Sequence, residues 1–144
     1  MLANYPDEVK ALRAANYQHD LALVAIVDGD GEGDRKRKEQ LDESLRNRHM
    51  SARLPGERVA TPIPTWAIEN WLLCLLAHPG VDEARGPKGS DARPTWKDVY
   101  EREYGDDERA AIRSATASFV ERDPSRLTLP SLTDGRLEFD RVSG

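Results

Sequence analysis

The stretch LALVAIVDGDGEGDRKRK, residues 21–38, decides the fold that the sequence predicts. Residues 21–27 form a continuous apolar run without polar alternation, which is typical of a strand buried on both faces of a parallel sheet. The run leads directly into Asp28 and Asp30, two aspartates one residue apart. Because like charges at this spacing repel and are poorly hydrated beside an apolar strand, the pair is expected to need a cation.

Helical patterns flank this strand on both sides. An amphipathic helix is predicted over residues 6–17, and a polar surface helix over residues 34–48 with Leu41 and Leu45 as its core contacts. Residues 57–64 indicate a second, short strand that ends in prolines. Helix alternating with buried strand favours an α/β fold, with a small, mostly parallel sheet flanked by helices.

The second half of the chain has a mainly helical pattern. TWAIENWLLCLLAH, residues 65–78, is the most regular helix, with one apolar face formed by Ile68, Trp71, Leu72, Leu75 and Leu76. A loop is predicted over residues 79–94, which carry glycines and prolines without periodicity.

Two further helices are predicted beyond that loop. The first covers residues 95–104 with Thr95 as its N-cap, and the second covers about residues 107–121. The tail from Asp123 is ambiguous, because Leu137 and Phe139 alternate as they would in a strand.

The length and charge of the chain limit the classes of protein. A chain of 144 residues predicts one domain, with an α/β core over residues 1–78, the loop, and a helical C-terminal extension over residues 95–144. No apolar run reaches the roughly 20 residues that a bilayer requires. A net charge of −5 argues against a protein that coats nucleic acid through net charge alone.

The N-terminus lacks a secretory pattern, so cytoplasmic residence is expected. The single cysteine, Cys74, is expected in the core.

The two aspartates are the first candidates for chemistry. Ligands of open α/β sheets gather at the carboxyl ends of strands, where Asp28 and Asp30 follow the run. In an extended segment they face the same side and can converge on one Mg²⁺, while Gly29 and Gly31 let the backbone turn tightly. The alternative interpretation is a solvated turn, because Asp and Gly are common turn residues.

Glu69 is the third candidate acid. Its helical neighbours at i+3, i+4 and i+7 are leucines, so its carboxylate leans on the flank of an apolar stripe. The alternative is that Glu69 only complements the positive N-terminus of its helix.

A basic block, Arg35 to Lys38, follows the acidic turn and could contact a phosphodiester substrate. The alternative is a solvated helix face partly paired between Asp34 and Lys38 and between Lys38 and Asp42. Neither a dinucleotide-binding glycine motif nor a P-loop is present in the sequence.

Taken together, these segments resemble the TOPRIM domain, the catalytic module of topoisomerases, primases, overcoming-lysogenization-defect nucleases and small defence-associated proteins of bacteria. The resemblance covers roughly residues 5–78. It rests on the strand ending in D-x-D, LVAIVDGDGEGD, and on the proline-preceded helix PIPTWAIENWLL, in which Glu69 matches the family's acid.

The resemblance implies a Rossmann-like, TOPRIM-type parallel sheet. It also implies a nuclease that depends on Mg²⁺ or Mn²⁺, or a subunit of one, and it suggests a role in bacterial anti-phage defence. It implies that Asp28, Asp30 and Glu69 hold the metal and serve catalysis. Substrate phosphate would be contacted by Arg35, Lys36 and Arg37, and the nucleic acid is expected to be DNA rather than RNA.

One departure from the family pattern leaves alternatives open. TOPRIM catalytic domains usually begin with a strand that ends in a glutamate, and this sequence has no counterpart of it. The sequence is therefore truncated, or another chain supplies the strand or glutamate, or the domain has lost catalysis. In the last case the expected function is that of a non-catalytic interaction subunit that docks onto a larger partner through an open sheet edge.

Overall fold

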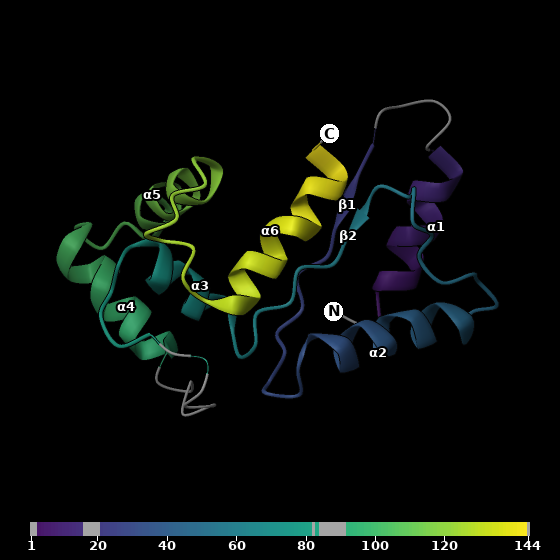
Figure 1. Cartoon of the computed structure of the whole chain (residues 1–144), viewed down its shortest axis with the longest axis horizontal. Helices are drawn as coiled ribbons and strands as arrows, with labels where there is room; N and C mark the ends of the chain where they lie inside the picture. The colour runs from purple at the N-terminus through teal and green to yellow at the C-terminus, as the bar shows by residue number, and fades with distance from the viewer. Residues whose placement is uncertain (1–2, 16–20, 82, 84–91, 144) are drawn as a thin grey trace.

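The computed structural model of the chain describes residues 3–15, 21–81, 83 and 92–143. Helices and a small sheet alternate in its first half, and helices alone form its second half (Figure 1). In chain order the elements are α1 (Tyr5–Ala15), β1 (Leu23–Val24), α2 (Asp34–Arg46), β2 (Val59–Ala60), α3 (Ile68–Leu75), α4 (Ala92–Glu103), α5 (Glu108–Val120) and α6 (Pro130–Ser143).

The sheet is a parallel pair joined by a helical crossover. Leu23 of β1 pairs with Val59 of β2, and Val24 pairs with Ala60. Extended backbone continues beyond the regular ladder, since the Ala25 N–H donates to the Ala60 carbonyl at 2.9 Å. The predicted small α/β fold with a parallel sheet is therefore confirmed.

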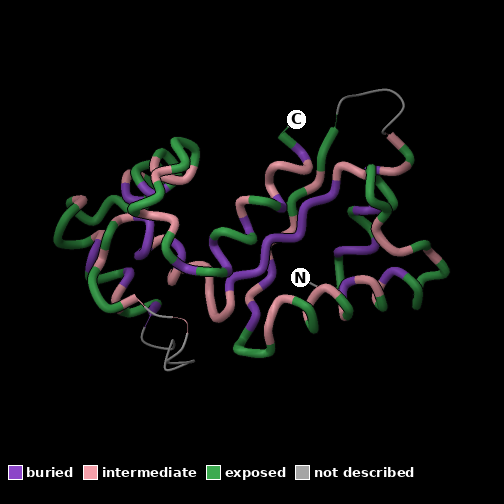
Figure 2. Tube along the Cα trace, in the orientation of Figure 1, coloured by how far each residue is buried: buried purple, intermediate pink, exposed green. Residues whose placement is uncertain are grey.

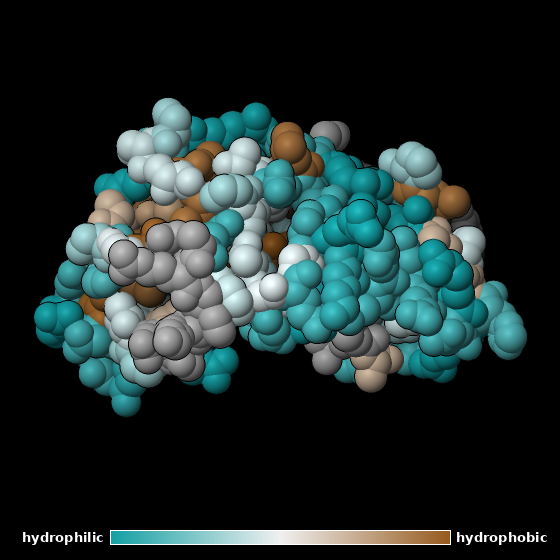
Figure 3. Space-filling view, turned by 60° about the horizontal axis from the view of Figure 1, so that its bottom comes forward, coloured by the Kyte–Doolittle hydropathy of each residue, from teal (hydrophilic) through white to brown (hydrophobic). Residues whose placement is uncertain are grey.

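Helices α1 and α2 cover one face of this pair (Figure 1). Their apolar residues form one buried cluster with alternate residues of the strand segments: Tyr5, Val9, Leu12, Val27, Leu41, Leu45, Val59 and Ile63. Leu41 and Leu45 are the two buried residues of α2, as its pattern predicted. The outer surface of α2 is hydrophilic, whereas hydrophobic side chains reach the surface toward the end that carries α3, α4 and α5 (Figure 3).

Helix α6 lies along β2 on the other side (Figure 1). The strand-like alternation of Leu137 and Phe139 was misleading, because residues 130–143 form a helix. Its buried positions, Leu132, Gly135, Glu138 and Val142, recur every three or four residues and therefore share one helical face. Leu137 is 62% exposed. The segment 59–64, buried throughout, runs between the two helical layers (Figure 2).

The remaining helices pack around α3. Helix α3 is shorter than predicted, because residues 65–67 precede its first turn. Helix α4 begins at Ala92, so the prediction of Thr95 as N-cap is wrong. Pro94 is tolerated in this first turn because the N–H groups there have no partner within the helix. Most of the predicted loop 79–94, namely residues 82 and 84–91, lies outside the described residues.

The first strand is more exposed than its apolar run predicted. Leu21 is 40% exposed and Val24 is 38% exposed, so burial on both faces is wrong for this end of the run. The physical reason is that β2 is the only neighbour of β1 in the sheet formed by the described residues.

Within the described residues, we find no helix whose length and apolarity would let it cross a membrane.

Candidate functional site

The candidate site lies where the extended segment after β1 meets the start of α3. Asp28 accepts a hydrogen bond from the Ile68 N–H at 3.1 Å. Ala67, the N-cap of α3, has no side chain that can cap the helix, so the Asp28 carboxylate supplies this contact from a distant part of the chain. The position of the Asp28 carboxylate and the orientation of α3 therefore depend on each other.

Burial raises the pKa of Asp28, and the negative charges of Glu69 and Asp30 raise it further. The hydrogen bond from Ile68 and the charge of Arg93 oppose this shift. A raised pKa shows that the charged form of Asp28 is disfavoured by its surroundings. The three acids that the sequence singled out thus influence one electrostatic environment.

Two glycines hold the acidic turn against the segment before α3. The Gly29 N–H donates to the Pro64 carbonyl and the Gly31 N–H donates to the Thr65 carbonyl, both at 2.8 Å. A Cβ atom on Gly29 would lie 2.5 Å from both of these carbonyl oxygens, so only glycine permits this approach. Gly31, at a φ of +75°, packs under the ring of Trp66. This contact places Asp28 at the first turn of α3.

Glu69 occupies that first turn and is largely buried. Its side chain is 12% exposed, and its Oε1 accepts a hydrogen bond from the Arg93 Nε at 3.1 Å. Its Oε2 is buried and has no hydrogen-bond partner within the described residues. Because Arg93 is itself 80% exposed, the negative charge of Glu69 is only partly compensated.

Asp30 pairs through its carboxylate with a residue of α2. Its φ of +48° takes the backbone out of the extended conformation, so the expectation that Asp28 and Asp30 face the same side does not hold. Its carboxylate accepts a hydrogen bond from the Arg37 guanidinium at 2.6 Å, and its side chain is 70% exposed. The structure therefore brings Asp28 and Glu69 together and directs Asp30 toward α2.

The fit of this site to a metal ion rests on two carboxylates. Within residues 3–15, 21–81, 83 and 92–143, no group of three or more His, Cys, Asp or Glu side chains is arranged to hold a metal. Asp28 and Glu69 still offer oxygen ligands, one of them buried and unpaired. Mg²⁺ is commonly held by one or two carboxylates while it keeps several waters, so this pair fits such an ion.

The basic block separates into outward and inward residues. Arg35 pairs with Glu39 at 3.3 Å on the surface, and Lys36 pairs with Glu32 at 2.8 Å. Arg37 pairs with Asp30, one of the three candidate acids, at 2.6 Å. Lys38 pairs with Asp34 as predicted, at 3.4 Å, and also approaches Glu138 of α6 at 3.5 Å.

Sequence reasoning missed a large apolar groove beside this site. The groove has a volume of about 640 Å³, and its apolar lining includes Ile26, Ile68, Leu72, Ile112, Phe119 and Val142. Glu69 also lines it. A possible signal was α5, whose sequence places apolar residues on more than one face. Ile112 on α5 is 39% exposed, while Ala111 and Ala115 on the same helix are fully buried.

A second hollow of about 360 Å³ lies next to the groove and is lined by Ile26, Val27, Asp28 and Ile68. Side chains of successive strand residues point to opposite faces, so three consecutive residues share one hollow only along the edge of the strand. The hollow therefore lies beside the extended segment that leads from β1 to Asp28.

Comparison of the chain with protein-family models, curated proteins and solved structures finds no match.

Proposed function

We propose that this chain is a TOPRIM-like nuclease that depends on Mg²⁺ or Mn²⁺, or a subunit of one, and that it hydrolyses phosphodiester bonds of nucleic acid, DNA rather than RNA. The observation that carries this proposal is the buried, unpaired Oε2 of Glu69 beside the half-buried Asp28. Two poorly hydrated carboxylates repel each other. A divalent cation would reduce this repulsion and would give the Glu69 Oε2 a partner.

The residues divide into two roles in this proposal. Asp28 and Glu69 hold the cation, and Arg37, which pairs with Asp30, contacts a substrate phosphate. When bound, the cation supplies positive charge against the charge that develops on the phosphodiester during hydrolysis. No described residue has been assigned as the general base, so a glutamate from another chain remains part of the proposal.

Divalent metal is expected to raise the melting temperature of the wild-type chain and not that of Asp28→Asn. Asparagine keeps an oxygen that can accept the Ile68 N–H bond and removes only the charge. At ten times the dissociation constant, mass action adds about 1.4 kcal/mol, or about 4 °C for a chain of this size. The measurement is thermal melting in EDTA, Mg²⁺ and Mn²⁺.

The matched control for this experiment is Asp98→Asn, which removes an exposed carboxylate on α4. The control should respond to metal as the wild type does. Metal-dependent cleavage of a labelled DNA duplex by the wild type, lost in Asp28→Asn, then tests catalysis separately. Identical melting curves of the wild type with EDTA and with millimolar metal would overturn the metal site.

We propose as a second candidate that the chain is a non-catalytic subunit whose partner adds a strand to β1. The free edge and the hollow beside it favour this function. The N–H groups of Leu23 and Ala25 donate to the carbonyls of Arg58 and Ala60, at 2.9 Å each. Backbone groups of successive residues alternate in direction, so those of Val24 and Ile26 point to the open edge. A partner strand would satisfy them and place side chains in the groove.

Amide hydrogen exchange of the isolated chain is expected to alternate along β1. The Val24 and Ile26 amides should exchange at least about tenfold faster than those of Leu23 and Ala25, because only the latter are bonded to β2. Equal protection at all four positions in a dilute, monomeric sample would contradict an open edge. Protection of Val24 and Ile26 that grows with protein concentration would identify a second copy as the partner.

A further inference from the structure

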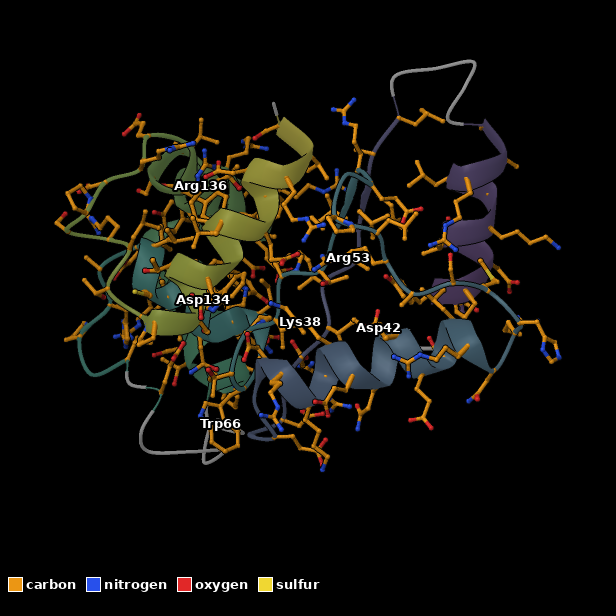
Figure 4. The ribbon with its side chains drawn as sticks, turned by 45° about the vertical axis from the view of Figure 1, so that its right-hand side comes forward. Lys38, Asp42, Arg53, Trp66, Asp134 and Arg136 are labelled. Atoms are coloured by element: carbon orange, nitrogen blue, oxygen red, sulfur yellow. The ribbon has the colours of Figure 1, made fainter. Side chains whose placement is uncertain are left out.

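A small polar hollow of about 200 Å³ lies between α1, α2, β2 and α6, and it shares no lining residue with the acidic site or the groove. Figure 4 shows Lys38 and Asp42 on α2, Arg53 across from them, and α6 alongside. The side chains that bear on its chemistry are Tyr5, Lys38, Asp42, Arg53, Thr61 and Arg141. These residues come from both halves of the chain, so the hollow exists only in the folded protein.

The lining of this hollow carries more cations than carboxylates. Three cations and one carboxylate line it. Arg53 is held rigidly, because its guanidinium donates to Glu138 at 2.6 and 3.3 Å and to Thr61 Oγ1 at 3.1 Å. Glu138 neutralises Arg53, and the charge of Lys38 is partly compensated by Asp34 and Glu138. Arg141, which donates to backbone carbonyls, is the lining cation with the least compensated charge among the described residues, so a ligand would meet the charges of Lys38 and Arg141.

Both of these cations retain unused hydrogen-bonding capacity. Lys38 has only long contacts, 3.4 Å to Asp34 and 3.5 Å to Glu138, and its ammonium group has three donors. Arg141 donates from one terminal nitrogen to the carbonyls of Leu54 and Pro55. Its Nε is buried without a partner within the described residues. Donors of the Lys38 ammonium group and of the terminal nitrogens of Arg141 can serve a ligand in the hollow.

Tyr5 adds a neutral donor to the wall. It is 3% exposed, and no hydrogen bond from its hydroxyl is found within the described part of the chain. Burial raises the pKa of Tyr5 to about 12, and the nearby charges change this less. The hydroxyl therefore stays protonated at neutral pH and can donate to an anion.

We propose that this hollow binds a small tetrahedral oxyanion of the phosphate class, with Lys38, Arg141 and Tyr5 as its donors. The volume suits one such group with a few waters, since a water occupies about 30 Å³. It is smaller than the roughly 300 Å³ at which pockets for drug-sized ligands begin. Asp42, the one carboxylate of the lining, repels any anion and limits the affinity expected of the site. The group is either a free anion or the terminal phosphate of a larger molecule.

The test is titration with inorganic phosphate at constant ionic strength, with EDTA present so that the result does not depend on the proposed metal site. Thermal melting and calorimetry are followed for the wild type, Lys38→Gln and Tyr5→Phe. Phosphate should raise the wild-type melting temperature in a saturable way that chloride does not reproduce. Lys38→Gln should weaken phosphate binding about tenfold or more, because a hydrogen bond to a charged group is lost.

The matched control is Arg46→Gln on the same helix, because Arg46 is exposed to solvent. It removes the same charge and should bind phosphate as the wild type does. Tyr5→Phe removes only the hydroxyl and should weaken phosphate binding while the fold is kept. A 5′-phosphorylated trinucleotide compared with its unphosphorylated form distinguishes a terminal phosphate from a free anion. Equal wild-type melting curves in phosphate and chloride, or equal losses in Lys38→Gln and Arg46→Gln, would overturn the proposal.

Discussion

Replacing Glu138 with glutamine is expected to lower the free energy of unfolding by about 3 to 5 kcal/mol, the usual cost of breaking a buried ion pair. Glu138 is 8% exposed and accepts hydrogen bonds from Arg53 and from the Thr61 N–H at 2.8 Å. Glutamine can still accept the Thr61 bond, but it leaves the Arg53 guanidinium, 16% exposed, without its counter-charge. Urea unfolding followed by tryptophan fluorescence measures the loss.

The matched control is Asp140→Asn on the same helix. The Asp140 carboxylate pairs with Arg122 at 2.8 Å on the surface, so its loss should cost less than about 1 kcal/mol. Replacing both Glu138 and Arg53 with apolar residues of similar volume should recover much of the stability, because no unpaired charge then remains. A Glu138→Gln variant as stable as the Asp140→Asn variant would show that α6 is not held by this ion pair.

The dependence of stability on pH offers a second readout of the same contact. Burial alone would raise the pKa of Glu138, but the hydrogen bonds from Arg53 and Thr61 and the charges of Arg53 and Lys38 outweigh it and hold the pKa below its usual value. The stabilisation is therefore complete above the unfolded pKa of about 4.3 and is lost as the pH falls through the lower, folded pKa. As the pH is lowered, the free energy of unfolding of Glu138→Gln should therefore fall less than that of the wild type.

Replacing Gly29 with alanine is expected to cost more than about 3 kcal/mol or to prevent folding, because an added methyl group meets atoms that cannot move aside. Its Cβ would lie 2.5 Å from the carbonyl oxygens of Pro64 and Thr65. Both are backbone atoms fixed by hydrogen bonds from Gly29 and Gly31. The turn must separate from the segment before α3, which also removes Asp28 from its contact with Ile68. Circular dichroism and urea unfolding report the effect.

Gly56→Ala is the control for this substitution. A Cβ on Gly56 meets no atom within 4 Å, and its φ is not among the positive values. The change should alter stability by no more than about 0.5 kcal/mol. If Gly29→Ala were as stable as Gly56→Ala, the close approach between the acidic turn and the α3 segment would be wrong.

Local periodicity predicted much of the fold. The pattern of α2 identified Leu41 and Leu45 because a surface helix with two buried leucines needs no tertiary information. The tail could not be assigned in this way. In α6 a glycine and a glutamate occupy buried positions, Gly135 under the ring of Trp71 and Glu138 beside Arg53. Both are buried for reasons that lie elsewhere in the chain, so the apolar pattern of α6 is broken.

The candidate site was only partly accessible to sequence reasoning for a similar reason. The sequence placed Asp28 after a strand and Glu69 in the first turn of a helix, and the structure has both features. The direction of Asp30 depends on a backbone turn with positive φ and on Arg37, neither of which a spacing rule contains. The polar hollow depends on residues as far apart as Tyr5 and Arg141, which only the tertiary fold brings together.

The position of α6 in the chain has a consequence for the order of folding. The Arg53–Glu138 contact joins residues 85 positions apart, and the bond from Arg58 to the Val142 carbonyl spans 84. Closing so long a loop costs entropy that is repaid only once the contact forms, so such contacts come late. Helices α1 and α2 can assemble on the strands from contacts nearer in sequence. Until α6 docks, the Thr61 N–H lacks the Glu138 acceptor and the segment 59–64 is uncovered on one side. This interval is when the chain is most exposed to mispairing with another copy, and the docking rate of α6 sets its length.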